Sequence, residues 1–166
     1  MAVQTPHLLK AASNVRRMEQ NLTGILDDNG RSAIAQEVGR NTLGLLKLSN
    51  EHYAFADGLS RANWRQKMSR LYYAAFHARR AIHLFVEGSY STDVSDHKNV
   101  GSFPDDFPNR DTYKTRLVDL RNDRNLADYD HEATEPDLLI PVGDAVSLVR
   151  QLLDETRQYL SARGLP

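Results

Sequence analysis

The stretch "NWRQKMSRLYYAAFHARRAIHLFVEG", residues 63–88, decides the fold. Its apolar side chains recur every three or four positions, a spacing that places them on one face of an α-helix. That face consists of Trp64, Met68, Leu71, Tyr72, Ala75, Ile82, Phe85 and Val86. Gly88 follows, where glycine commonly ends a helix. We predict one long helix whose broad apolar face must be covered by other helices.

The sequence on the N-terminal side predicts two further helical segments. Residues 7–26 carry apolar side chains at three- and four-residue steps, until "DDNG" at 27–30 ends the pattern. Residues 31–59 show the same periodicity, either as one helix or as two helices broken near Gly39 to Gly44. Both segments can cover the apolar face of the helix at 63–88.

On the C-terminal side, residues 89–109 are rich in Ser, Asp, Gly and Pro. This composition predicts a long connection, with one short helical turn around His97. A further helix is expected to begin near Asn109 or Asp111. The segment "HEATEPD" at 131–137 interrupts it, because its proline disfavours helical backbone at the preceding residue.

A last helix is predicted over residues 142–162, where apolar side chains again recur at helical spacing. We find no period-two strand pattern, no internal repeat and no linker that would divide the chain. The sequence therefore predicts an all-α fold, an antiparallel up-and-down bundle of four to five helices. Residues 1–166 are expected to form a single domain.

Composition narrows the chemistry and the location. The chain has 166 residues, of which 40% are hydrophobic, and it contains no cysteine. Disulfides, thiolate nucleophiles and cysteine-based zinc sites are therefore excluded. His-Glu-x-x-His, P-loop and glycine-rich dinucleotide motifs are absent, so no metal or other cofactor is expected. No apolar run is long enough to cross a bilayer, and we expect a cytoplasmic protein of bacterial type with no membrane partner.

The formal net charge is −1, so no overall positive field attracts the chain to nucleic acid. Contact with RNA would need a local basic patch, and three groups of residues are candidates. They are Arg61, Arg65, Lys67 and Arg70; Arg79 and Arg80; and Arg110, Lys114, Arg116, Arg121 and Arg124. Solvated helix faces are the alternative interpretation of each group.

The segment "RNDRNLADYDH", residues 121–131, places a charge on a packing face. Positions 117, 120, 124, 127 and 131 share one side of a continuous helix, and Leu117, Leu120 and Ala127 make that side apolar. Arg124 must therefore be compensated, because an unpaired buried charge costs several kcal/mol. It either pairs with a carboxylate or faces a cleft. The candidate carboxylates are those of Asp105, Asp106, Asp123, Asp128 and Asp130.

Arg124 and His131 together suggest a catalytic interpretation. In a continuous helix they would lie on one side, about 10 Å apart along the axis. A guanidinium group offers a fork of donors for phosphate, and an imidazole transfers protons near neutral pH. The pair is the minimum that metal-free cleavage of a phosphodiester requires.

Three stretches, in order, resemble the HEPN domain family (higher eukaryotes and prokaryotes nucleotide-binding), which consists of small all-helical bundles. "SRLYYAAFHARRAIH" is similar to the family's Tyr-Tyr-Ala-x-Phe-His-Ala-x-Arg helix, and "SDHKNVGSF" is similar to its Ser-x-His-Lys-x-Val-x-x-Phe loop. "RNLADYD" is similar to its Arg-x-x-Ala-Asp-Tyr-Asp segment. The resemblance spans roughly residues 60–131 within a core of 60–163. Residues 1–50 look like a variable N-terminal helical extension.

The resemblance implies a metal-independent endoribonuclease that acts as a homodimer. Many family members carry an arginine, a polar residue and then a histidine, which Arg124, Asn125 and His131 match with six residues between arginine and histidine. This is the long end of the family spacing, and Tyr129 stands where a shorter spacing would place the histidine. We expect catalytic Arg124, Asn125 and His131, with RNA as substrate.

The resemblance also implies a biological role, beside which two other interpretations of the chain remain. A HEPN ribonuclease of this size is expected to be the toxin of a toxin-antitoxin pair or part of a phage-defence system, with a small nucleotidyltransferase as antitoxin partner. Relatives with the Ala-Asp-Tyr segment often lack the histidine, so a non-catalytic module that binds nucleotide, RNA or a protein is the second interpretation. The third is a helical scaffold in which Arg124 is only a buried clamp.

Overall fold

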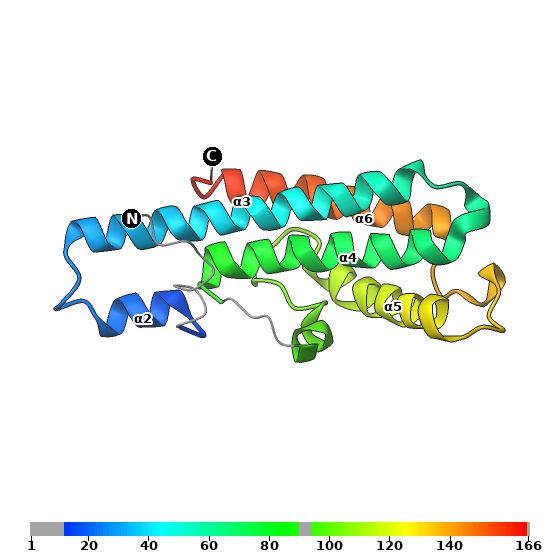
Figure 1. Ribbon diagram of the computed structural model, residues 1–166, viewed down its shortest axis with the longest axis horizontal. Helices are drawn as coiled ribbons and strands as arrows, with labels where there is room; N and C mark the ends of the chain where they lie inside the picture. Colours follow the sequence, from blue (N-terminus) through cyan, green and yellow to red (C-terminus); the bar gives the residue numbers. More distant parts are fainter. Residues whose placement is uncertain (1–11, 90–93, 166) are drawn as a thin grey trace.

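The computed structural model describes residues 12–89 and 94–165, and Figure 1 shows their arrangement. The described residues form an all-helical bundle without a β-strand, as predicted; only an isolated bridge joins Asn14 and Ser89. The longer helices are α2 (Val15–Asn21), α3 (Asp28–Gly58), α4 (Trp64–Ile82), α5 (Arg110–Tyr129) and α6 (Val142–Ser161). None of the described helices is both long and apolar enough to cross a bilayer.

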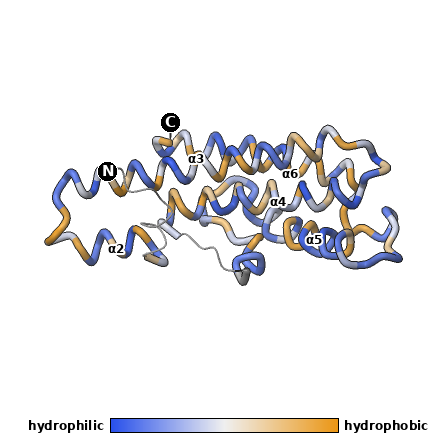
Figure 2. Tube along the Cα trace, in the orientation of Figure 1, coloured by the Kyte–Doolittle hydropathy of each residue, from blue (hydrophilic) through white to orange (hydrophobic). Residues whose placement is uncertain are grey.

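Helix α4 is the centre of the bundle, and it packs against α3, α5 and α6. Met68, Leu71, Tyr72 and Ile82 are completely buried along its length. Burying one such large side chain stabilises the fold by about 1.5–3 kcal/mol, which explains why this face organises the bundle. Figure 2 shows hydrophobic and hydrophilic residues alternating along the helices, as expected of helices that pack one side against a bundle.

Helix α3 is one continuous helix of 31 residues, so the interpretation with a break near Gly39 to Gly44 is wrong. A glycine inside a helix costs only about 1 kcal/mol, which the packing of a long helix offsets. Thr42, Ser49 and Ala56 recur every seven residues and are fully buried. These small side chains let α3 approach α4 closely, and the Ser49 hydroxyl donates to the Ala74 carbonyl oxygen at 2.7 Å.

The first predicted helix, over 7–26, is wrong in its bounds. Its residues 7–11 lie outside the described residues, and α2 begins only at Val15, because the Asn14 side chain accepts a hydrogen bond from the Arg17 amide and caps the helix there. The "DDNG" segment begins the next helix. The Asp27 side chain accepts from the Gly30 amide at 2.7 Å and caps α3.

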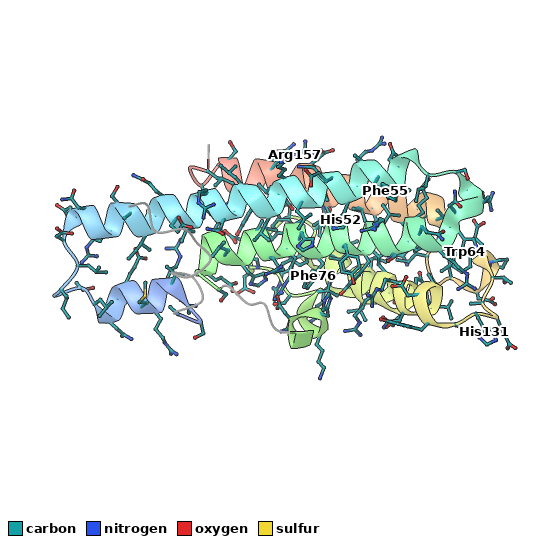
Figure 3. All side chains as sticks on the ribbon, in the orientation of Figure 1. His52, Phe55, Trp64, Phe76, His131 and Arg157 are labelled. Carbon is teal, nitrogen blue, oxygen red and sulfur yellow. The ribbon has the colours of Figure 1, made fainter. Side chains whose placement is uncertain are left out.

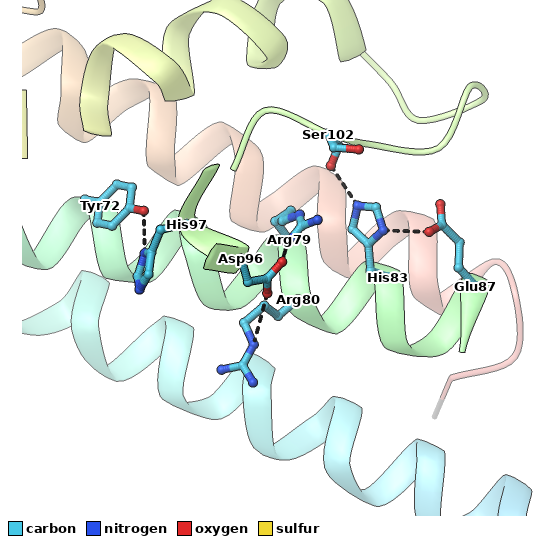
Figure 4. Close-up of polar contacts among 8 residues, drawn as sticks. All are labelled: Tyr72, Arg79, Arg80, His83, Glu87, Asp96, His97 and Ser102. Carbon is cyan, nitrogen blue, oxygen red and sulfur yellow. Dashed lines mark hydrogen bonds and ion pairs between the residues drawn. The ribbon is translucent and has the colours of Figure 1, made fainter. Parts of the chain in front are cut away.

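The end of the central helix matches the prediction in position and differs in winding. After α4 the chain makes a π-helical turn, η2 (His83–Glu87), and Gly88 ends it with a left-handed φ of 70°. The wider turn includes His83, whose ring contacts the Glu87 carboxylate and the Ser102 carbonyl oxygen, each at 2.7 Å. This histidine therefore fastens the following connection to the end of α4 (Figure 4).

The connection contains the short helical turn expected around His97, a 3₁₀-helix η3 (Val94–Asn99). Helix α5 then begins at Arg110 and ends at Tyr129, and Asp130 already has extended backbone. The short η4 (Glu135–Asp137) lies in the predicted interruption. Beyond it, the buried Asp123 carboxylate accepts from the amides of Leu139 and Ile140 at 2.7 and 2.9 Å, which ties the segment before α6 to α5.

Candidate nucleic-acid interface

Arg124 lies between α5 and α4, with a side chain that is only 16% exposed. Its Nη2 donates to the Tyr73 hydroxyl at 2.6 Å, and its Nε is 2.8 Å from Asp128 Oδ2. The guanidinium carbon also lies 5.2 Å from the ring centre of Tyr73 and 5.6 Å from that of Tyr129. Pairing with Asp128, one of the expected carboxylates, is confirmed.

The environment keeps the guanidinium charged. Burial lowers the pKa of Arg124, but Tyr73, Asp128 and Tyr129 together raise it, and the net shift is upward. The buried Nε has no hydrogen-bond partner of suitable angle, so its short contact with Asp128 is mainly Coulombic. Arg124 therefore clamps α5 to α4, and Asp128 of the same chain compensates most of its charge.

Asn125 and His131 occupy different surroundings. Asn125 is exposed, and its side-chain oxygen accepts from Arg124 Nη1 at 3.0 Å. His131 lies beyond the end of α5 with its side chain 93% exposed, and its nearest charged neighbour is Glu132, at 3.9 Å. Figure 3 places it at the tip of the bundle. Arg124 and His131 would share a face only if the helix continued to His131, and α5 ends before it. A single chain therefore brings together Arg124 and Asn125 but not His131.

A cluster of stacked rings lies beside Arg124. His52 of α3 stacks on Tyr73 and His77 of α4, with ring centres 5.6 and 5.5 Å apart. His97 of η3 stacks on Phe76 at 4.1 Å. No role was assigned to His52 from the sequence. Its membership depends on the register between α3 and α4, which no local pattern encodes.

The histidines of this cluster are uncharged near neutral pH. Burial lowers the pKa of His77 to about 4, with further lowering by Arg80, His52 and His97. Burial, and then nearby arginines, lower the pKa values of His52 and His97 as well. The positive charge of the region therefore comes from arginine. No group of histidine and acidic side chains in the described part of the chain is arranged to hold a metal ion.

The η3 turn is fastened to α4 by two side chains (Figure 4). Asp96 accepts from Arg79 Nη1 at 2.6 Å and lies 3.9 Å from Arg80 Nε. The Tyr72 hydroxyl and His97 Nδ1 are 2.7 Å apart. Arg79 and Arg80 therefore do not form the basic patch considered from the sequence, because they hold η3 in place. Tyr72 is core, and burial raises its pKa to about 12.

A hollow of about 450 Å³ opens between α4 and α5 next to Arg124. We call it the α4–α5 groove, and its lining residues are Arg65, Gln66, Ser69, Arg70, Tyr73, Ala127 and Asp128. Arg65 is fully engaged, since it donates to the carbonyl oxygens of Ala127, Asp130 and Ala133 at the end of α5.

Arg70 is the available cation of the groove. It is exposed and has no carboxylate partner within 12–89 and 94–165. Its Nη1 lies 3.4 Å from His52 Nδ1, and its guanidinium carbon lies 5.4 Å from the ring of Phe55, which is 55% exposed. A guanidinium group without a carboxylate partner, beside an exposed ring, is an arrangement that binds phosphate and stacks bases.

No protein-family model, no curated protein and no solved structure matches the chain.

Proposed function

We propose that the chain is a non-catalytic HEPN-like module that binds RNA in the α4–α5 groove. The observation that carries the proposal is Arg70, an exposed guanidinium without a carboxylate partner among the described residues, at the wall of a hollow of about 450 Å³. In a chain of net charge −1, such a cation is a local point of attraction for a phosphate group.

The other side chains of the groove suit a single strand. The Arg70 fork can donate two parallel hydrogen bonds to a phosphate. The neighbouring Ser69 hydroxyl donates to Asp128 at 3.4 Å and so reinforces the lining. Beside Arg70, the 55% exposed ring of Phe55 offers a surface on which a base can stack without regard to sequence. Asp128 makes the far wall acidic, so the groove orients a strand rather than attracting it uniformly.

Arg124 supports the groove and, in this proposal, does not need to touch RNA. It fixes the Tyr73 hydroxyl and the Asp128 carboxylate, which are both lining groups. A phosphate that replaced these partners would have to break a short hydrogen bond and an ion pair in a partly buried position. Binding through the exposed Arg70 avoids that cost.

The test compares two arginine variants in the full chain. Fluorescence anisotropy with a labelled single-stranded RNA oligonucleotide gives the dissociation constants of wild type, Arg70→Gln and Arg157→Gln. Arg157 is a matched control, because it is 55% exposed on α6 and lines no part of the groove (Figure 3). We expect Arg70→Gln to weaken binding about tenfold and Arg157→Gln to change it less than about twofold. Equal effects of the two variants would refute the groove.

Catalysis is the second candidate function, favoured by the 93% exposure of His131 and the exposure of Asn125. In a homodimer, His131 would accept the proton of a 2′-hydroxyl group while the 2′-oxygen attacks the adjacent phosphorus. The partner subunit's His131 would protonate the departing 5′-oxygen. Arg124 would stabilise the charge of the transition state and Asn125 would orient it, after Arg124 exchanges Asp128 for phosphate. A nucleotidyltransferase would be the expected antitoxin.

Catalysis and binding are separated by the products. A ribonuclease of this kind cleaves RNA in EDTA, leaves 2′,3′-cyclic phosphate ends and fails on a substrate with deoxyribose at the scissile position. Its expression would arrest growth, and His131→Ala would relieve the arrest. If wild-type dimer leaves RNA intact while it still binds the oligonucleotide, the binding module is the correct function. If His131→Ala cleaves as fast as wild type, the catalytic assignment is wrong.

A further inference from the structure

A second hollow, of about 430 Å³, lies between the η3 connection and the first turns of α5. Its walls include Lys98, Ser102, Phe103, Arg110, Lys114 and Val118. We call it the η3–α5 pocket. None of its lining residues lines the α4–α5 groove, so the following inference does not rest on the proposed function.

We infer that the η3–α5 pocket binds a small organic phosphate, a phosphomonoester of a molecule that carries an aromatic ring. Three residues with cationic side chains line the pocket, and they come from two different segments of the chain, Lys98 from η3 and Arg110 and Lys114 from α5. A dianionic phosphate group is the ligand charge that such a triad fits best.

The charges of the pocket are largely uncompensated. Lys98 and Lys114 have neither an ion-pair nor a hydrogen-bond partner in the described part of the chain. Arg110 pairs with Asp105 at 2.9 Å, but that carboxylate is 93% exposed, and a surface pair of this kind exchanges at little cost. The pocket therefore gathers positive charge in a protein whose net charge is −1.

The walls of the pocket are held in place from both sides. A Cβ atom on Gly101 would lie 2.5 Å from the Lys114 carbonyl oxygen, so only glycine lets the connection rest directly on the α5 backbone. On the other side, His83 contacts the Ser102 carbonyl oxygen at 2.7 Å (Figure 4). Because these contacts are made by the chain itself, binding does not require the backbone that carries the lysines to be rearranged first.

The rest of the pocket decides the kind of phosphate. Phe103 and Val118 provide apolar surface beside the cations, which inorganic phosphate would leave unused. Phe103 itself stacks on Phe107 at 4.8 Å and is held rigidly. A volume of about 430 Å³ falls in the range of small-molecule sites, and it accommodates one phosphorylated ring compound.

Isothermal titration of the full chain with AMP, adenosine and inorganic phosphate tests the inference, with AMP as the probe of a phosphomonoester that carries an aromatic ring. We expect AMP to bind about tenfold more tightly than phosphate or adenosine. The double variant Lys98→Gln/Lys114→Gln should weaken AMP binding at least about tenfold. Lys47→Gln removes an 80% exposed lysine of α3 outside the pocket, and it should leave AMP binding unchanged.

Circular dichroism of each variant establishes that it is folded, and Lys98→Gln alone provides a milder change should the double variant fail to fold. Absence of AMP binding at millimolar concentration, or equal AMP affinity in wild type and lysine variants, would overturn the inference. A parallel titration uses RNA oligonucleotides with and without a 5′-phosphate. If the lysine variants weaken the binding of both oligonucleotides as much as that of AMP, the pocket is part of an RNA path and not a small-molecule site.

Discussion

Arg124 of α5 donates a 2.6 Å hydrogen bond to the hydroxyl oxygen of Tyr73 on α4. The two residues are 51 positions apart in the sequence, and each belongs to a different stretch of the HEPN resemblance. The contact gives the two stretches a common structural purpose, which is to fix α5 against the central helix. Tyr73 also lines the α4–α5 groove, so the clamp supports that groove.

The clamp should be measurable as stability. Tyr73→Phe removes the acceptor for Arg124 but keeps the aromatic ring, and we expect the free energy of unfolding to fall by about 1–2 kcal/mol. Tyr53→Phe is the matched control, because the Tyr53 hydroxyl accepts from Arg150, whose side chain is 60% exposed. It should cost about 0.5 kcal/mol or less. Urea unfolding measures both, and equal losses would contradict the clamp.

The histidine cluster predicts acid sensitivity. The folded-state pKa of His77 is about 4, against 6.5 in the unfolded chain, so the unfolded state binds the extra proton between these values. The stability that neutral His77 contributes is therefore fully present above pH 6.5 and is lost as the pH decreases toward 4. At pH 5 the loss from His77 should be about 1–2 kcal/mol, after allowance for its partial exposure.

His77→Phe tests this origin, because phenylalanine keeps a ring in the stack and cannot be protonated. The buried Nδ1 of His77 has no hydrogen-bond partner in the described residues, so its removal should not destabilise the protein at pH 7.5. We expect the variant to lose less stability than wild type between pH 7.5 and pH 5, in urea unfolding at both values. An identical pH dependence in the two proteins would show that His77 is not the origin of the acid sensitivity.

Substitution of two glycines by alanine should change the stability of the protein in opposite directions. Gly88 has a φ of 70°, and a Cβ there would lie 2.7 Å from the Arg16 amide nitrogen. Gly88→Ala should therefore cost about 2 kcal/mol or more. Gly143 lies in the first turn of α6, with nothing within 4 Å of its Cβ position. Gly143→Ala should stabilise by about 0.5–1 kcal/mol, and thermal unfolding distinguishes the two signs.

Asp123 should matter more than a neighbouring aspartate on the same helix. Asp123→Ala leaves the part-buried amide of Leu139 and the buried amide of Ile140 without their acceptor, at an expected cost of about 2–4 kcal/mol. Asp119→Ala removes only a 3.6 Å pair with Arg116 and should cost about 0.5 kcal/mol or less. If the two variants unfold at the same urea concentration, the carboxylate does not hold the segment before α6.

The helices could be read from the sequence where their stabilisation is periodic and local. The apolar faces of α4, α5 and α6 predicted those helices to within a few residues, because helical periodicity is a property of neighbouring positions. The true start of α2 depends on the Asn14 cap. The π-turn includes His83, which meets Ser102, 19 residues away. Such contacts form only in the folded chain.

The candidate site could likewise be predicted from the sequence only where local spacing determines it. That Arg124 needs a partner followed from its place on a packing face, and Asp128, one turn away, was among the candidates. Tyr73 and His52 could not be assigned, because their positions depend on how α3, α4 and α5 are set against one another. The end of α5 at Tyr129 decides the place of His131, and the sequence left open whether the helix continued past it.

The salt dependence of RNA affinity tests the central claim most directly. A phosphate contact by Arg70 releases counterions, so the slope of log affinity against log salt concentration should become shallower by roughly one in Arg70→Gln. Arg157→Gln should keep the wild-type slope. If Arg70→Gln binds the same RNA with the wild-type affinity and the wild-type slope, the α4–α5 groove is not where this protein meets RNA.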